Sequence, residues 1–348
     1  MRRAHQIQLP FAAWPKEDRN RWNVAFKPGD SFDDCGPAAH LADRTRRDLH
    51  YRYGCFLGFL ASRFPDLLAL EPAERLASSH IAQYVALRRR SCSERTVAGD
   101  LRKLRAALRL ICPTSDWSWL LAIAKRIEAQ APPRFERHHL VTSDRLYALG
   151  IELMDRATAG AVGLTGPTKA QAFDYRDGLI IALLALIPLR RRTLAALRIG
   201  KQLVKCGQFW SLDIPAEDTK TRRALDYPVS PELSARIDVY LSKFRRRIPG
   251  ADRHDGLWAS NQACRMDHGS IYDAVCRRTK TAFDFPVNLH RFRHAAATLW
   301  STQDPANVRG VKDLLGQASF QTTEKHYIMS QSRLAGRALA QAVSMLRK

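Results

Sequence analysis

Apolar residues recur every three or four positions in the first third of the chain. Leu49, Tyr53, Phe56 and Leu60 keep this spacing until Pro65. A period near 3.6 residues is that of an amphipathic helix, and a proline ends such a helix. The pattern therefore predicts that this region begins with a long helix.

Three further helices are predicted before residue 132. One covers 79–90. The next follows Ser91 and Glu94, which have the spacing of a capping box, and carries an apolar stripe as far as Pro113. The last lies near 117–131. Together these segments predict a small four-helix unit.

The pattern becomes mixed after residue 142. Apolar and polar residues alternate over 209–214 and again over 225–229, on either side of a polar turn. Alternation with a period of two predicts a β-hairpin. Helical spacing covers 142–153, 174–189, 231–244, 270–283, 290–300 and 334–346. The fold class predicted is mainly α with a small antiparallel β-sheet or hairpin.

Composition shifts divide the chain into four segments. The first 40 residues mix tryptophan, proline and glycine without a sustained period, and helix breakers mixed with charge follow Pro132. We therefore expect an irregular N-terminal arm, a helical domain, a linker and a larger mixed domain with a C-terminal tail. Their predicted bounds are 1–40, 41–131, 132–141 and 142–348.

The charge balance indicates a polyanionic partner. The 348 residues carry 56 basic and 34 acidic side chains, a net charge of +22, and nucleic acid leads the list of such partners. The candidate DNA-binding cations lie on the predicted helices of the first domain: Arg88, Arg89, Arg90, Arg95, Arg102, Lys103, Arg105 and Arg109. The alternative is that each is an ordinary solvated charge.

Cysteine usage and hydropathy bear on compartment. Seven cysteines are scattered without a CxxC pair, which argues against a disulfide framework and a zinc site. The longest apolar run, 178–189, is too short to span a bilayer. We therefore expect free thiols, no metal and no membrane span. A cytoplasmic, nucleoid-associated protein is predicted.

Three separate segments carry candidate chemistry. His290 and Arg293 lie three residues apart, so that a helix would place an imidazole and a guanidinium on one face, suited to a phosphate. Arg190 directly follows a predicted buried helix. Tyr327 stands alone after a Gly-interrupted helix and a Thr-Thr turn. The alternatives are a surface His–Arg pair and a structural tyrosine.

In sequence order these segments resemble the tyrosine recombinases of the phage integrase family. Residues 188–197 are similar to the family's GLRxxELxxL pattern, Thr219-Lys220-Thr221 to its TKT-like hairpin, 290–294 to its HxxRH element, and Tyr327 to its nucleophile. The resemblance covers about residues 142–335. It implies a mixed α+β catalytic domain preceded by a SAM-like helical core-binding domain.

The resemblance also implies a mechanism. Arg190 and Arg293 would clamp the scissile phosphate, Lys220 would protonate the leaving 5′ oxygen, and His290 would assist proton transfer. Tyr327 would attack phosphorus to form a 3′-phosphotyrosyl bond. DNA would then be rejoined by transesterification without a metal, ATP or any cofactor. The enzyme class implied is a site-specific recombinase or integrase of a mobile element.

Two positions depart from the family pattern. Gln317 follows the Leu-Gly pair where the family has His or Trp, and Thr193 replaces a common Glu. A glutamine amide donates a hydrogen bond, but it is uncharged and does not take up or release a proton as an imidazole does. A catalytically weakened DNA-binding or accessory protein is therefore the alternative, and a type IB topoisomerase-like relaxing enzyme is a third.

The resemblance further implies assembly on DNA. The partner would be double-stranded DNA at specific recombination sites, bound by a homo-tetramer or by a dimer on each site. The predicted C-terminal helix carries an apolar stripe at Leu334, Ala338, Ala342 and Leu346. This stripe suits docking on a neighbouring copy, and equally folding back on its own domain.

Overall fold

The computed structural model describes residues 8–30, 33–132, 141–161 and 166–303. The chain divides into two compact units, Met1–Phe135 and Glu136–Lys348, and each encloses its own hydrophobic core. Most of the predicted linker, Gln317, Tyr327 and the C-terminal stripe lie outside the described residues. None of the helices in the described part is long and apolar enough to span a membrane.

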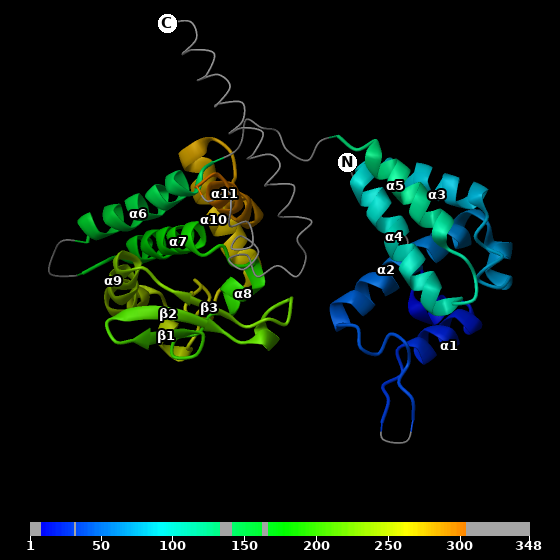
Figure 1. Cartoon of the computed structure of the whole chain (residues 1–348), viewed down its shortest axis with the longest axis horizontal. Coiled ribbons are helices and arrows are strands. Elements are labelled where there is room, and N and C mark those ends of the chain that lie inside the picture. Colours follow the sequence, from blue (N-terminus) through cyan, green and yellow to red (C-terminus); the bar gives the residue numbers. More distant parts are fainter. Residues whose placement is uncertain (1–7, 31–32, 133–140, 162–165, 304–348) are drawn as a thin grey trace, which may run out of the picture. The chain divides into compact units, whose positions relative to one another are not determined.

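The N-terminal unit consists of five α-helices around one core (Figure 1). They are α1 (Lys16–Ala25), α2 (Asp43–Arg63), α3 (Ser78–Arg89), α4 (Glu94–Ile111) and α5 (Ser118–Ala129). The apolar stripe of α4 is buried, as its spacing predicts. Its N-cap is Ser93, whose hydroxyl accepts from the Thr96 amide, and not Ser91 as the capping-box pattern suggested.

The irregular arm expected over residues 1–40 is wrong in its central part. Residues 16–25 form α1, and Trp14 and Trp22 are each 2% exposed within the core. Their rings meet edge to face at 5.5 Å, a favoured aromatic geometry. The sequence did not predict this helix because most of its residues are polar and its apolar face is short.

A buried ion pair joins α1 to the rest of this unit. Asp18 is fully buried, accepts a hydrogen bond of 2.8 Å from the Tyr53 hydroxyl, and lies 2.6 Å from the Arg75 guanidinium. Arg75 is 2% exposed and also donates to the Leu70 carbonyl at 2.8 Å. A buried charge is tolerated only with such partners.

We expect Asp18→Ala to destabilise the protein by about 3–5 kcal/mol, because it leaves the Arg75 charge buried without its carboxylate. The neighbouring Glu17→Ala removes an exposed pair with Arg21 and should cost under about 1 kcal/mol. Urea unfolding of both variants measures the difference. Equal stabilities would show that α1 is not part of the folded core.

The second unit combines helices with a small sheet. Its helices are α6 (Ser143–Ala159), α7 (Lys169–Leu186), α8 (Arg191–Ala196), α9 (Pro231–Val239), α10 (His268–Phe283) and α11 (Leu289–Gln303). Its strands are β1 (Leu203–Cys206), β2 (Phe209–Ile214) and β3 (Leu225–Pro228). The mainly helical fold with a small antiparallel sheet, predicted from the sequence, is confirmed.

Close packing of α6 on α7 forms the centre of this unit. At Gly150 an added Cβ would lie 2.6 Å from the Ala182 amide nitrogen, and at Gly178 it would lie 2.7 Å from the Gly150 carbonyl. Glycine at both positions therefore lets the two backbones meet. A capping box of Thr168 and Gln171 begins α7. Most of the residues that follow in this helix are buried, and most of these are apolar.

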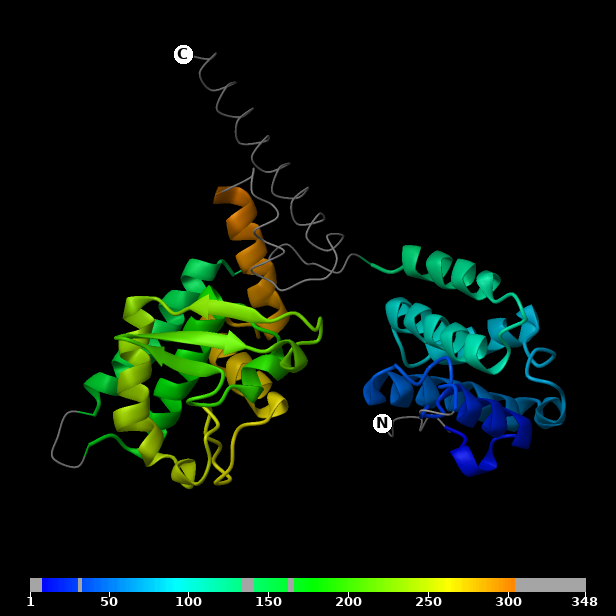
Figure 2. The ribbon, with the colours of Figure 1, turned by 60° about the horizontal axis from the view of Figure 1, so that its bottom comes forward.

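The sheet has the order β1-β2-β3 with both pairs antiparallel (Figure 2). Leu212 in the central strand faces Leu203 on one side and Tyr227 on the other. The predicted hairpin is thus present as β2 and β3, and β1 adds a strand that the alternation did not indicate. The connection between β2 and β3 carries Lys220.

Candidate active site

Two predicted arginines come together at the end of α7. Arg190 follows the Ile187-Pro188-Leu189 segment and is the N-cap residue of α8. Arg293, in α11, is 8% exposed and donates a hydrogen bond to the Pro188 carbonyl. This bond ties α11 to the segment that precedes Arg190, across 105 residues of sequence.

Burial and like charge disfavour the protonated form of both groups. Desolvation, with a smaller contribution from the neighbouring Arg190, lowers the pKa of Arg293 to about 10. Burial also lowers the pKa of half-buried Arg190. Both remain cations at neutral pH. Two cations held in a partly desolvated place are an arrangement that an anion stabilises.

Tyr227 of β3 belongs to the same cluster. Its phenol acts electrostatically on both guanidinium groups, partly opposing the fall in their pKa values. The side chain is half-buried and packs against the core of the unit. Sequence reasoning placed Tyr227 in the hairpin by alternation but did not assign it to the site, because no local motif marks it.

The first turn of α11 presents His290. The Asn288 side-chain oxygen accepts from the backbone amides of His290 and Arg291 at 3.1 and 3.2 Å, which satisfies the helix N-terminus. The His290 side chain is exposed, and its ring stands perpendicular to that of buried His294 at 4.5 Å. The predicted sharing of one helix face by His290 and Arg293 follows from this helix.

Lys220 lies in the ordered loop between β2 and β3. Its neighbour Thr219 is buried, and the Thr219 hydroxyl lies 3.0 Å from the Ala216 carbonyl oxygen and accepts from the Arg223 amide at 3.0 Å. These bonds hold the turn, while the Lys220 side chain is exposed. Among the described residues Lys220 makes no ion pair. The loop thus presents an amine on a braced turn.

The predicted DNA-binding cations of the N-terminal unit fall into three groups. Arg88 is buried and lies 2.5 Å from Asp100, so its assignment to DNA binding is corrected to a structural ion pair. Arg89, Arg102 and Lys103 make exposed pairs with Glu94, Glu128 and Asp48, and Arg95 and Arg105 donate to the carbonyls of Pro132 and Trp117. Arg90 and Arg109 are exposed.

Exposed ion pairs such as Arg89–Glu94 are worth little in water. A phosphate can therefore replace the carboxylate at small cost, whereas Arg88 cannot leave Asp100, which also lies 2.7 Å from Arg52. Arg88 is buried because it faces Asp100 of α4. The run of three arginines in the sequence does not show which of them faces that helix.

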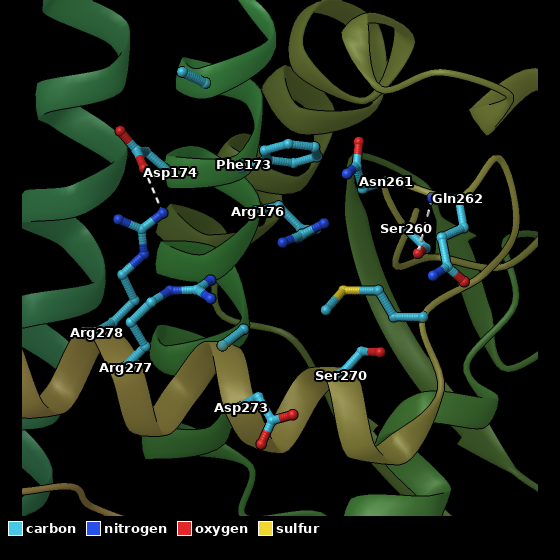
Figure 3. A pocket seen from close by; sticks show the side chains of 13 residues that line it. Phe173, Asp174, Arg176, Ser260, Asn261, Gln262, Ser270, Asp273, Arg277 and Arg278 are labelled. Atoms are coloured by element: carbon cyan, nitrogen blue, oxygen red, sulfur yellow. Dashed lines mark hydrogen bonds and ion pairs between the residues drawn. The ribbon is translucent and has the colours of Figure 1, made fainter.

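A separate cleft of about 610 Å³ lies between α7, α10 and the 260–266 loop (Figure 3). Arg176 lies over the Phe173 ring at 4.8 Å and is 2.7 Å from buried Asp177. Arg278 lies 3.0 Å from the same carboxylate. Because its buried cations are neutralised by carboxylates, this cleft offers no charge comparable with that of Arg190 and Arg293. No cluster suited to a metal ion occurs among the residues that the structure describes.

Comparison with known proteins agrees with this arrangement. Residues 163–333 match the model of the phage integrase family. A tyrosine recombinase XerD from Chlamydia pneumoniae is 26% identical over 181 residues, which cover 52% of this chain and 57% of that protein. The match thus spans little more than half the length of that relative.

Solved structures of recombinases are also similar. XerA recombinase is 16% identical with a TM-score of 0.43, over 87% of this chain and 94% of that one. A post-cleavage complex of the XerH site-specific recombinase with a palindromic difH substrate is 15% identical with a TM-score of 0.45, over 86% and 97% of the respective chains.

The paired arginines, the HxxRH helix and the family match together define a tyrosine recombinase catalytic domain. By this match, residues 163–333, about half of the chain, carry the domain of the phage integrase family.

The cluster of Arg190 and Arg293 should bind sulfate or inorganic phosphate. At about ten times the dissociation constant the anion should stabilise the protein by about 1.4 kcal/mol. We expect Arg293→Gln to lose this increment, because the anion then meets a single guanidinium.

The control is Arg291→Gln, two residues away and therefore on a different helix face. Thermal unfolding with and without the anion measures the increment, and the control corrects for the general stabilising effect of sulfate. Equal increments in the two variants would contradict an anion site at Arg293.

Proposed function

We propose that this protein is a site-specific DNA recombinase that cuts and rejoins DNA through a 3′-phosphotyrosyl intermediate. The observation that carries the proposal is the juxtaposition of Arg190 and Arg293, held by the hydrogen bond from Arg293 to the Pro188 carbonyl. A phosphodiester is an anion that gains charge in its transition state. Two guanidinium groups held next to each other suit that charge.

The arginines would act on the non-bridging oxygens of the scissile phosphate. Charge-assisted hydrogen bonds from guanidinium groups strengthen as negative charge develops on those oxygens. Burial and the neighbouring Arg190 lower the pKa of Arg293 to about 10, and a bound phosphate would offset the repulsion between the two cations. Pre-arranged cations of this kind accelerate the reaction because they need little reorganisation in the transition state.

The remaining steps would use three further residues. The Tyr327 oxygen would form a bond to phosphorus while the bond from phosphorus to the 5′ oxygen breaks. Lys220 would give that oxygen its proton, and His290 would accept the proton from the phenol. A 5′ hydroxyl of another strand then attacks the phosphotyrosyl bond, releasing Tyr327. Because the intermediate conserves the bond energy, no ATP is consumed.

The proposed partner is duplex DNA at specific sites, bound by a homo-tetramer or by one dimer at each site. The net charge of +22 supports a polyanionic partner, and the relative XerH is described in complex with its DNA substrate. Arg90 and Arg109 are the exposed cations of the helical unit that we assign to phosphate contact. Action at DNA would make this a cytoplasmic, nucleoid-associated protein.

Tyr327→Phe should retain DNA binding and lose the covalent adduct entirely, because phenylalanine has no oxygen to bond phosphorus. A nicked suicide substrate built from the ends of the native element traps the adduct of the unmodified protein on a denaturing gel. An adduct that persists in the variant would overturn the assignment of the nucleophile.

The same experiment discriminates the accessory-protein alternative. If Gln317 marks lost catalysis, the unmodified protein binds the site and forms no adduct. Gln317→His should then raise the yield of adduct, since imidazole restores a group that carries a proton.

Lys220→Ala should slow cleavage of ordinary DNA by about 100-fold or more, the contribution of a positioned general acid. A substrate with sulfur in place of the 5′ bridging oxygen should be cleaved almost equally by both proteins, because a thiolate leaves without a proton. Lys201→Ala, an exposed lysine paired with Asp255, is the matched control. An equal loss on both substrates would assign Lys220 to binding instead.

A further inference from the structure

A second basic surface lies on the catalytic unit, outside the candidate active site. It is a cleft of about 690 Å³ between the end of α6, the start of the segment before α7, and the turns after α9. Its lining comprises Thr158, Ala161, Gly166, Pro167, Ser242, Lys243, Phe244, Arg246 and Arg247. Three of these side chains are cations and none is a carboxylate.

An irregular helix creates this surface. After α9 the chain continues as a π-helical turn, Tyr240–Phe244, and then as a 3-10 turn, Arg245–Arg247. The buried Tyr240 and Phe244 rings fix the inner face of these turns. Lys243 of the π turn and Arg246 and Arg247 of the 3-10 turn are exposed on the outer face. Such turns occur frequently at functional sites.

The cations of this cleft differ in how they are used. Arg245 is structural, because it donates to the carbonyls of His254 and Gly256 at 2.9 and 2.8 Å. Lys243 and Arg246 make no ion pair with any described residue. They contrast with Arg102 and Lys103 of the helical unit, which are paired with carboxylates.

Arg247 is held at the mouth of the cleft. An added Cβ at Gly166 would lie 2.6 Å from its Nη2 atom, so the guanidinium packs directly on a glycine backbone. Gly166 has a φ of +66°, in the left-handed region that favours glycine. This glycine therefore gives the arginine room to lie beside Lys243 and Arg246 over the cleft.

Like charges gathered without a carboxylate repel one another, and an anion removes that repulsion. The forked guanidinium groups of Arg246 and Arg247 match the oxygens of a phosphodiester, and Lys243 adds a point charge. The cleft lies beside the start of α7, whereas Arg190 follows the end of that helix (Figure 1). The cleft and the candidate active site at Arg190 are therefore separate surfaces of this unit.

We propose that the cleft of Lys243, Arg246 and Arg247 is a second DNA-binding surface, which contacts backbone phosphates of duplex outside the cleavage site. The contact requires no base sequence and no catalysis. The surface therefore goes beyond the proposed function and would hold even if the protein did not cleave DNA.

The test is the salt dependence of binding to a long duplex of arbitrary sequence. Each neutralised phosphate contributes about 0.9 to the slope of log affinity against log salt. The variant with Lys243→Ala, Arg246→Ala and Arg247→Ala should lose about two to three units of slope, relative to the unmodified full chain.

The control variant carries Lys169→Ala, Lys201→Ala and Arg253→Ala, three exposed cations scattered over the same unit, so that the net charge falls equally. Its slope should change by less than about one unit. Thermal unfolding checks that both variants fold. Slopes that agree between the two variants would overturn the second surface, whereas failure to trap an adduct on site DNA would overturn the recombinase proposal alone.

Discussion

The geometry of the candidate site depends on one buried arginine. Arg293 is 8% exposed, lies near a second cation, and is fixed by its hydrogen bond to the Pro188 carbonyl. Placing a cation there opposes folding, since burial together with the nearby Arg190 lowers its pKa to about 10. The packed core of α7, α11 and the sheet has to supply the compensating stability. Such strain is typical of a functional site rather than of a structural ion pair.

The helical unit handles its buried charges in the opposite way. Asp18 is matched by Arg75 and Tyr53, and Asp100 lies between Arg52 and Arg88. These carboxylates join residues of α1, α2, α3 and α4, as well as the turn that carries Arg75. The helical unit thus pairs the charged groups of these two networks with one another, as the second unit does for Arg176, Asp177 and Arg278. Arg190 and Arg293 instead place two guanidinium groups together. Charges paired with carboxylates stabilise the fold, whereas two neighbouring cations suit the binding of an anion.

Much of this could be predicted from the sequence. The apolar period located α2 to α5 and α9 to α11 to within a few residues, because each helix buries one face. The hairpin followed from alternation, and the arginine motifs followed from their spacing. The first strand was missed since Leu203–Cys206 buries a single residue, and α1 was missed since its buried Trp22 packs against His50, which lies far along the chain.

Local patterns also failed where partners come from distant segments. Arg88 has the same surroundings in sequence as Arg89 and Arg90, yet Asp100 draws it into the interior. Tyr227 has no motif, and its place beside Arg190 and Arg293 depends on the strand pairing of β2 with β3. The roles of Gln317 and Tyr327 stay predictions, since both lie outside the described residues.

The contact of Gly150 with Gly178 has a consequence for genetic screens. A methyl group at either position meets backbone atoms within 2.7 Å, so α6 and α7 would have to separate. The segment with Pro188 and Arg190 continues directly from α7, and its displacement would misalign the two guanidinium groups. An allele at either glycine would then score as inactive although it touches no nucleotide, and only a fold-sensitive assay would distinguish it from a lesion in the chemistry.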